Sequence, residues 1–108
     1  MKPVRFMGGA KLNLSAFPDS ARLRAGHELF MVQVGREPDN WKPMPSVGAG
    51  VSEIRVRDQA GQFRVIYVAN FRTAIYMLHE YQKKTQKTSE VEMDLAGNRD
   101  TDAQGFKT

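Results

Sequence analysis

The sequence predicts an α+β fold in which a small antiparallel sheet is packed by two N-terminal helices. One stretch of the first fifty residues repeats apolar side chains at helical spacing. The pattern then changes to a period of two and to short apolar runs, over three consecutive segments separated by turn signals. The expected order is β-α-α-β-β-β-α, with the helices mainly on one face. At 108 residues the chain is expected to form a single domain, residues 1–108.

The N-terminal part supplies the first strand and both of these helices. Residues 3–7 are β-like and residues 10–17 can form a short helix. Pro18 suits the first turn of a second helix, and Gly35 suits its end. Residues 36–50 hold three of the five prolines without periodicity, which predicts a loop. The helical stripe of the second helix consists of Ala21, Ala25, Leu29 and Val32.

Three strands follow, joined as a meander. Residues 52–57 alternate apolar and charged side chains, as a half-buried strand does. Residues 62–69 are apolar on both faces apart from Arg64, as expected of a central strand, and residues 74–81 form the third.

A last helix is expected to open at a capping box. Ser89 is followed three residues later by Glu92, which is the spacing of that motif. Gly97-Asn98 should end this helix early, so that residues from about 97 to 108 form a poorly ordered tail.

Composition excludes several kinds of chemistry. The chain has no cysteine, so disulfides and thiolate catalysis are excluded. His27 and His79 stand on different elements without metal-ligand spacing, so no metal and no cofactor are expected. No apolar run approaches the roughly 20 residues of a membrane span, and the expectation is a cytoplasmic protein without a membrane partner.

The charge distribution points to a polyanionic partner. Residues 1–87 carry fourteen lysines and arginines against seven acidic residues, whereas residues 88–108 carry two against five. A basic body of this kind is typical of nucleic-acid-binding proteins, although many ordinary domains are mildly basic.

Cations recur on the strands themselves. Arg55 and Arg57 alternate along the first strand of the meander, where a solvated strand face explains them equally well. Arg64 is different, because a cation among apolar side chains is destabilising unless it has a partner or faces a groove. We expect Arg55, Arg57, Arg64 and Lys83 or Lys84 on one concave surface, with Ile54, Val56, Leu78 and the helical stripe on the other side.

Such a surface suits cleavage of RNA without metal. The 2′-OH of the RNA attacks the adjacent phosphate, arginine forks stabilise the phosphorane, and other side chains transfer protons. The candidate catalytic residues are Arg64, Lys83, Lys84, His79 and Tyr81. The candidate nucleic-acid-binding residues are Arg55, Arg57, Arg72 and Lys87.

Three motifs carry a family resemblance across residues 41–95. They are WKPMPSVGAGVSEIRVRD, GQFRVIYVA and LHEYQKKTQKT. With them the chain resembles the HigB-like, phage-related toxins of the RelE/ParE superfamily, the toxin halves of type II toxin–antitoxin systems. The resemblance implies a ribosome-dependent endoribonuclease (an mRNA interferase) that cleaves translated mRNA and is neutralised by an antitoxin, usually a helix-turn-helix protein.

By motif position, the resemblance also implies residue roles. Arg64 would contact the scissile phosphate, Arg55 and Arg57 the RNA backbone, and Lys83 with Lys84 the basic step after the last strand. The acidic run EVEMDLAGNRDTDAQ departs from the basic C-terminal helix common among these toxins. Two alternatives therefore stay open: a ParE-like inhibitor of DNA gyrase that cuts no RNA, and an attenuated phage remnant that binds RNA or antitoxin without cutting.

Overall fold

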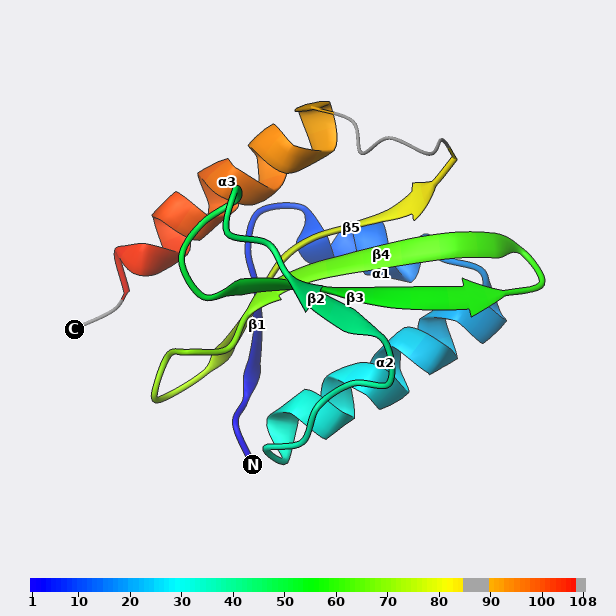
Figure 1. Ribbon diagram of the computed structural model, residues 1–108, viewed down its shortest axis with the longest axis horizontal. Coiled ribbons are helices and arrows are strands. Elements are labelled where there is room, and N and C mark those ends of the chain that lie inside the picture. Colours follow the sequence, from blue (N-terminus) through cyan, green and yellow to red (C-terminus); the bar gives the residue numbers. More distant parts are fainter. Residues whose placement is uncertain (85–89, 107–108) are drawn as a thin grey trace.

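The computed structural model describes residues 1–84 and 90–106 as an α+β domain with one five-stranded sheet and three helices (Figure 1). The elements in chain order are β1 (Val4–Phe6), α1 (Ala10–Ser15), α2 (Asp19–Gln33), β2 (Trp41–Pro43), β3 (Val51–Asp58), β4 (Gly61–Val68), β5 (Ile75–Lys83) and α3 (Glu90–Gln104).

The sheet has the strand order β1-β5-β4-β3-β2. The strands β2 to β5 pair antiparallel, whereas β1 pairs parallel with β5. The expected order was wrong in one place, because β2 lies inside the segment expected to be a loop. The prolines of that segment are the reason that no strand was predicted there. Pro43 ends β2, which is an edge strand, where a missing N–H is tolerated, and Trp41 pairs with Ile54 of β3.

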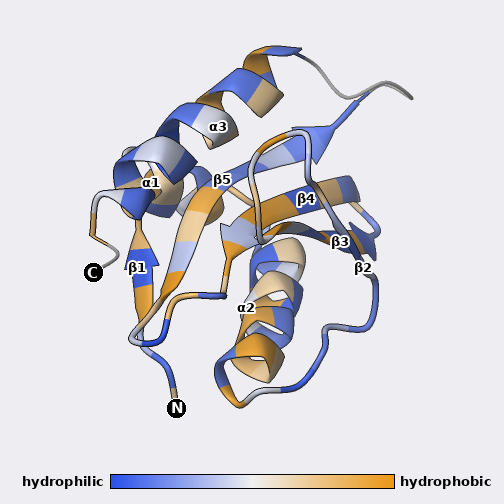
Figure 2. Cartoon of the chain, turned by 60° about the vertical axis from the view of Figure 1, so that its left-hand side comes forward, coloured by the Kyte–Doolittle hydropathy of each residue, from blue (hydrophilic) through white to orange (hydrophobic). Residues whose placement is uncertain are grey.

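Helices cover both faces of the sheet, which corrects the expectation that they lie mainly on one (Figure 2). The first core lies between the sheet and the two N-terminal helices and includes Ala21, Ala25 and Phe63. The second core lies under α3 and includes Ile66, Leu78 and further residues of the strands, with Ala96 and Ala103 from the helix.

The stripe expected on α2 is confirmed. Ala21, Ala25 and Leu29 are buried, and Val32 packs at the edge of the same core. Pro18 stands at the N-cap position, directly before the first turn, and makes no side-chain capping hydrogen bond. Gly35 follows its end with φ of 84°, a left-handed conformation in which a side chain would be strained.

The last helix does not end at Gly97. It continues to Gln104, because Ala96, Asp100 and Ala103 are buried against the sheet and the loop before β3. A Cβ on Gly48 would collide with the carboxylate of Asp100, so a glycine there lets the helix approach. Glu92 lies in the first turn, but Ser89 of the expected capping box lies outside the described residues.

A bulge in β4–β5 moves one expected core residue to the other face. The register shifts between Ile66 and Tyr67, so that Tyr67 pairs with Met77 and Ile66 with His79. Leu78, left between these pairs, packs in the second core under α3 instead of against α2. No helix in the described part of the chain is long and apolar enough to cross a membrane.

Candidate functional site: an arginine-lined cleft

Two cross-strand rows bring the predicted cations together on the α3 face of the sheet. Arg55 pairs with Arg64, which pairs with Tyr81 on β5. The neighbouring row runs from Arg57 through Gln62 to Lys83. Since side chains alternate along each strand, both rows project from the same face as Ile66 of the second core.

These side chains border a cleft near the turn that joins β3 to β4. Its volume is about 370 Å³, and it is lined by Asn40, Arg55, Val56, Arg57, Gln62 and Arg64. Ile54 and Val56 pack on the opposite side with α2, as expected. The expected clustering of Arg55, Arg57 and Arg64 is therefore confirmed, and Lys83 stands opposite Gln62 beside them.

Arg64 lies at the floor of this cleft and is only 6% exposed. Its Nη1 donates to the carbonyl of Phe63 at 3.1 Å, and its Nη2 donates to Oε1 of Gln62 at 3.2 Å. Burial lowers the pKa of the guanidinium, and the nearby Glu53 carboxylate partly opposes that shift. A guanidinium has five N–H donors, so these contacts leave a second N–H on each Nη group for a ligand.

Glu53 supplies the countercharge for two of the arginines. This carboxylate is 2% exposed, and its Oε1 lies 3.4 Å from Nε of Arg55 and 3.6 Å from Nε of Arg64. Glu53 thus contacts both guanidinium groups at their Nε atoms. Glu53 was not predicted as part of the site, because in the sequence it fits the alternation of charged residues with Arg55 and Arg57.

His79 does not open into this cleft. The ring is 4% exposed and lies under α3. Its Nε2 lies 3.1 Å from Oε2 of Glu92, and its Nδ1 lies 3.1 Å from Nη1 of Arg99. Burial lowers the pKa of His79, and the nearby Glu92 carboxylate partly opposes that shift. A neutral ring that accepts from Arg99 at Nδ1 donates from Nε2 to Glu92.

A polar network around His79 fixes α3 on the sheet. Nη1 of Arg99 donates to the carbonyl of Leu78 at 2.9 Å and to Oδ1 of Asn13 at 3.2 Å. The ring of Tyr81 stacks on the imidazole of His79, with ring centroids 5.6 Å apart. Asn13, Glu92 and Arg99 were not predicted, because residues from three separate elements meet here without a local motif.

The remaining candidate residues are dispersed. Lys84 is exposed directly after β5, and Lys87 lies outside the described residues. Arg72 is exposed in the turn between β4 and β5. That turn is at the opposite end of the hairpin from Arg64 and Lys83, so Arg72 is not part of the cleft.

The comparisons with known proteins now give the chain a family. Residues 13–101 match the family described as phage derived protein Gp49-like (DUF891). The chain belongs to this family. It is a toxin-like family related to the RelE/ParE toxins, which confirms the resemblance at that level but not the narrower HigB-like assignment. No curated protein matches the chain in sequence.

The arrangement suits a phosphodiester ligand. Three guanidinium groups, one of them desolvated, converge from adjacent strands, and Asn40 and Gln62 add amide donors and acceptors. Arginine forks match the geometry of phosphate oxygens, and a partly buried site strengthens each such contact.

Proposed function

We propose that this Gp49-like protein is the toxin of a type II toxin–antitoxin system and cleaves mRNA on the ribosome. The observation that carries the proposal is the convergence of Arg55, Arg57 and Arg64 on one open cleft. A solvated strand face accounts for the exposed Arg57, but not for a buried guanidinium at the floor of the same cleft. The relation of the family to RelE/ParE toxins supports the same conclusion.

The cleft supports attack by the RNA on itself. The 2′-oxygen bonds to the adjacent phosphorus, the bond from phosphorus to the 5′-oxygen breaks, and a cyclic phosphate and a 5′-hydroxyl result. In this mechanism Arg55 and Arg57 hold the backbone, and the free N–H groups of Arg64 stabilise the charge on the phosphorane. A base takes the 2′-proton, and an acid gives one to the leaving oxygen.

Lys83 and Tyr81 lie nearest to the cleft among the candidates for proton transfer. Tyr81 pairs with Arg64 and Lys83 with Gln62. His79 lies one cross-strand row further from the cleft than Tyr81, under α3, and is held by Glu92. In this proposal it therefore acts by supporting the stacked ring of Tyr81. Direct proton transfer by His79 requires α3 to move.

RNA binding without cleavage is the second candidate, because His79, a candidate for proton transfer, is buried under α3 and held by Glu92. The charge of α3 weakens the binding of RNA in either case. This helix carries Glu90, Glu92, Asp94, Asp100 and Asp102 against the single basic residue Arg99. It packs on the same face of the sheet as the arginines, and its negative charge opposes the approach of a polyanion. Glu53 further reduces the net charge of the cleft.

Primer extension on a translated mRNA after induction of the protein separates these possibilities. Toxin activity predicts discrete cuts within codons, their absence with Arg64→Ala, and their persistence with Arg36→Ala. Arg36 is the control because it is exposed beyond the C-terminal end of α2. The other end of this helix lies beside the β3–β4 turn, where the hydroxyl of Ser20 donates to Asp58. Intact mRNA with RNA retained on the protein supports the second candidate, and intact mRNA with gyrase–DNA breaks supports a ParE-like inhibitor.

The proposed partners follow from the same function. They are mRNA on the ribosome and a cognate antitoxin of the helix-turn-helix kind. A small helix-turn-helix protein encoded beside this chain, and growth rescue when the two are expressed together, are the observations that test the antitoxin.

A further inference from the structure

The outer edge of β1 is open. β1 stands at the end of the strand order, beside β5 alone. The carbonyl of Pro3 accepts from N–H of Ile75 at 2.9 Å, and N–H of Met7 donates to the carbonyl of Met77 at 3.0 Å. Because backbone groups alternate along a strand, those of Arg5 face β5, and those of Val4 and Phe6 face outward. Within the described residues, no further strand pairs with them.

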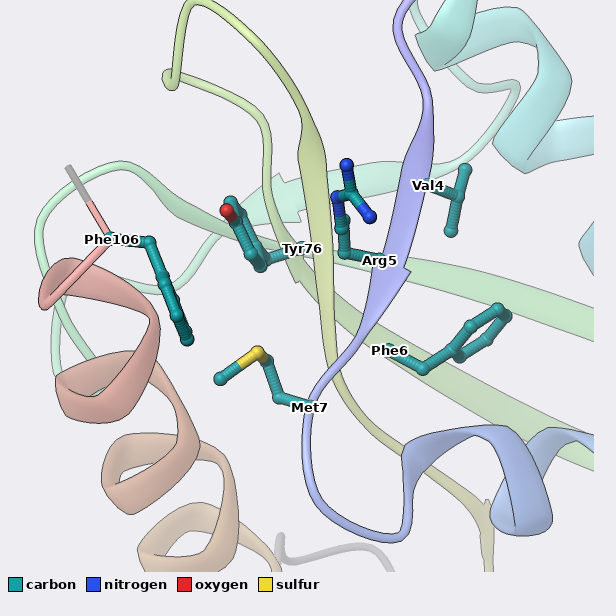
Figure 3. A pocket seen from close by; sticks show the side chains of 6 residues that line it. All are labelled: Val4, Arg5, Phe6, Met7, Tyr76 and Phe106. Atoms are coloured by element: carbon teal, nitrogen blue, oxygen red, sulfur yellow. The ribbon is translucent and has the colours of Figure 1, made fainter.

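A cavity of about 590 Å³ surrounds this edge (Figure 3). Val4 and Phe6 point to one side of β1, toward the first core. Arg5 and Met7 point to the other side, toward Tyr76. The ring of Phe106 completes that side: it lies parallel to the ring of Tyr76 at 6.1 Å, yet it is 63% exposed. Open backbone groups are thus flanked by apolar surface and one cation.

We propose that an extended, acidic segment of a partner protein binds here by adding a strand to the edge of β1. The backbone of that segment pairs with Val4 and Phe6, in the manner of β-strand addition. An acidic side chain on the α3 side meets Arg5, with its methylene groups beside Phe106, and the alternate, apolar side chains lie on the other side beside Val4 and Phe6.

The charge of the edge selects an acidic occupant. Arg5 is exposed, and it forms no ion pair with another described residue. Residues 1–87, which contain the whole sheet, hold fourteen basic residues against seven acidic ones. An acidic strand therefore gains a specific contact at Arg5 and a favourable long-range field.

Arg5 also argues against the binding of a second copy of this chain at the edge of β1. If two β1 strands paired antiparallel through Val4 and Phe6, each Arg5 would lie directly opposite its counterpart. The pair would be of the non-hydrogen-bonded kind, in which side chains come closest, and like charges there are destabilising. This inference concerns an edge remote from the arginine-lined cleft, and it does not depend on the proposed nuclease function.

Two short synthetic peptides test the proposal on the full chain. In one, glutamate alternates with valine; in the other, lysine replaces glutamate. Binding is followed by amide chemical shifts of the protein, which also locate the site. We expect the acidic peptide to shift the amides of Val4, Phe6 and Phe106, and to bind about three- to tenfold more tightly than the basic one. Arg5→Glu should reverse that preference.

A matched pair of variants tests the contact with Phe106 on the α3 side of β1. Phe106→Ala should weaken the acidic peptide several-fold, whereas Phe30→Ala, which removes an exposed ring on α2, should not. Both positions are exposed, so both variants should fold. Three results would overturn the proposal: equal binding of the two peptides, shifts confined to Arg55 and Arg57 in the cleft, or dimerisation of the protein through β1.

Discussion

The carboxylate of Glu53 lies 3.6 Å from Nε of Arg64, and both side chains are buried in the middle of the sheet. Glu53 stands on β3 and Arg64 on β4, on the face that carries α3. A buried cation without a counterion would be strongly destabilising, so Glu53 is what allows Arg64 to sit at the floor of the cleft.

Removing that carboxylate should destabilise the fold. Glu53→Gln leaves Arg64 buried without its countercharge, and loss of one partner of a buried ion pair costs about 3 kcal/mol or more. Urea unfolding measures the loss. Asp39→Asn is the control, because Asp39 and its partner Arg24 are both exposed and such a pair contributes about 0–1 kcal/mol. Equal losses in the two variants would show that Glu53 is not the required counterion.

Glu80 should make stability fall as pH rises. This side chain is 2% exposed, and within the described residues neither of its oxygens has a hydrogen-bond partner. Burial raises the pKa of Glu80 from its ordinary value of 4.5 to about 8. The folded state therefore holds a proton that the unfolded state releases between those values, so the stabilisation present below pH 4.5 is lost as pH approaches 8.

Glu80→Gln isolates this contribution. One pKa unit corresponds to about 1.4 kcal/mol, so the shift sets an upper bound of roughly 5 kcal/mol. The variant should match the parent protein in unfolding free energy near pH 4 and exceed it by an amount within that bound near pH 8.5. His79, whose lowered pKa acts in the opposite direction, is present in both proteins and cancels in the comparison. A difference that does not change with pH would contradict the assignment.

Arg99 should anchor α3. Its Nη1 donates to Leu78 and Asn13 and contacts His79, and hydrogen bonds from a charged group contribute about 1.5–3 kcal/mol. Arg99→Met should lower the unfolding free energy by that amount and speed hydrogen exchange along α3. Arg22→Met, which removes an exposed pair with Asp19 on α2, should change stability by less than about 1 kcal/mol. Unchanged exchange in α3 would refute the anchoring role.

The cleft should bind RNA with a measurable salt dependence. Arg57 is exposed at its rim, so Arg57→Ala should weaken RNA binding irrespective of sequence. It should also reduce the slope of log affinity against log salt by about one unit. Arg36→Ala, at a distant exposed position, should leave the slope unchanged. An unchanged slope in Arg57→Ala would make Arg57 an ordinary solvated residue.

The local patterns of the sequence predicted most of the fold. The stripe on α2 and the alternation in β3 fix which side faces the first core, and they also placed Arg55, Arg57 and Arg64 together. The strand β2 was missed because its residues include a proline and show no alternation, and pairing with β3 defines it instead.

The parts that sequence reasoning missed depend on tertiary contacts. Leu78 changed face because of a bulge, which alternation does not anticipate. Gly97 predicts a helix end, but packing of Ala96 and Ala103 outweighs the weak helix propensity of glycine. The roles of Glu53 and Asn13 emerge only when β3 meets β4 and α1 meets β5.

The most direct test of the nuclease proposal is the rate at which purified protein cleaves ribosome-bound mRNA, compared with Arg64→Lys. Lysine keeps the charge but lacks the fork of N–H donors, and loss of one preorganised donor typically lowers the rate about a hundred- to a thousandfold. Urea unfolding of the same samples shows whether the variant remains folded. The account predicts a folded Arg64→Lys variant with cleavage reduced by about that factor; a folded variant that cleaves at the parental rate would contradict it.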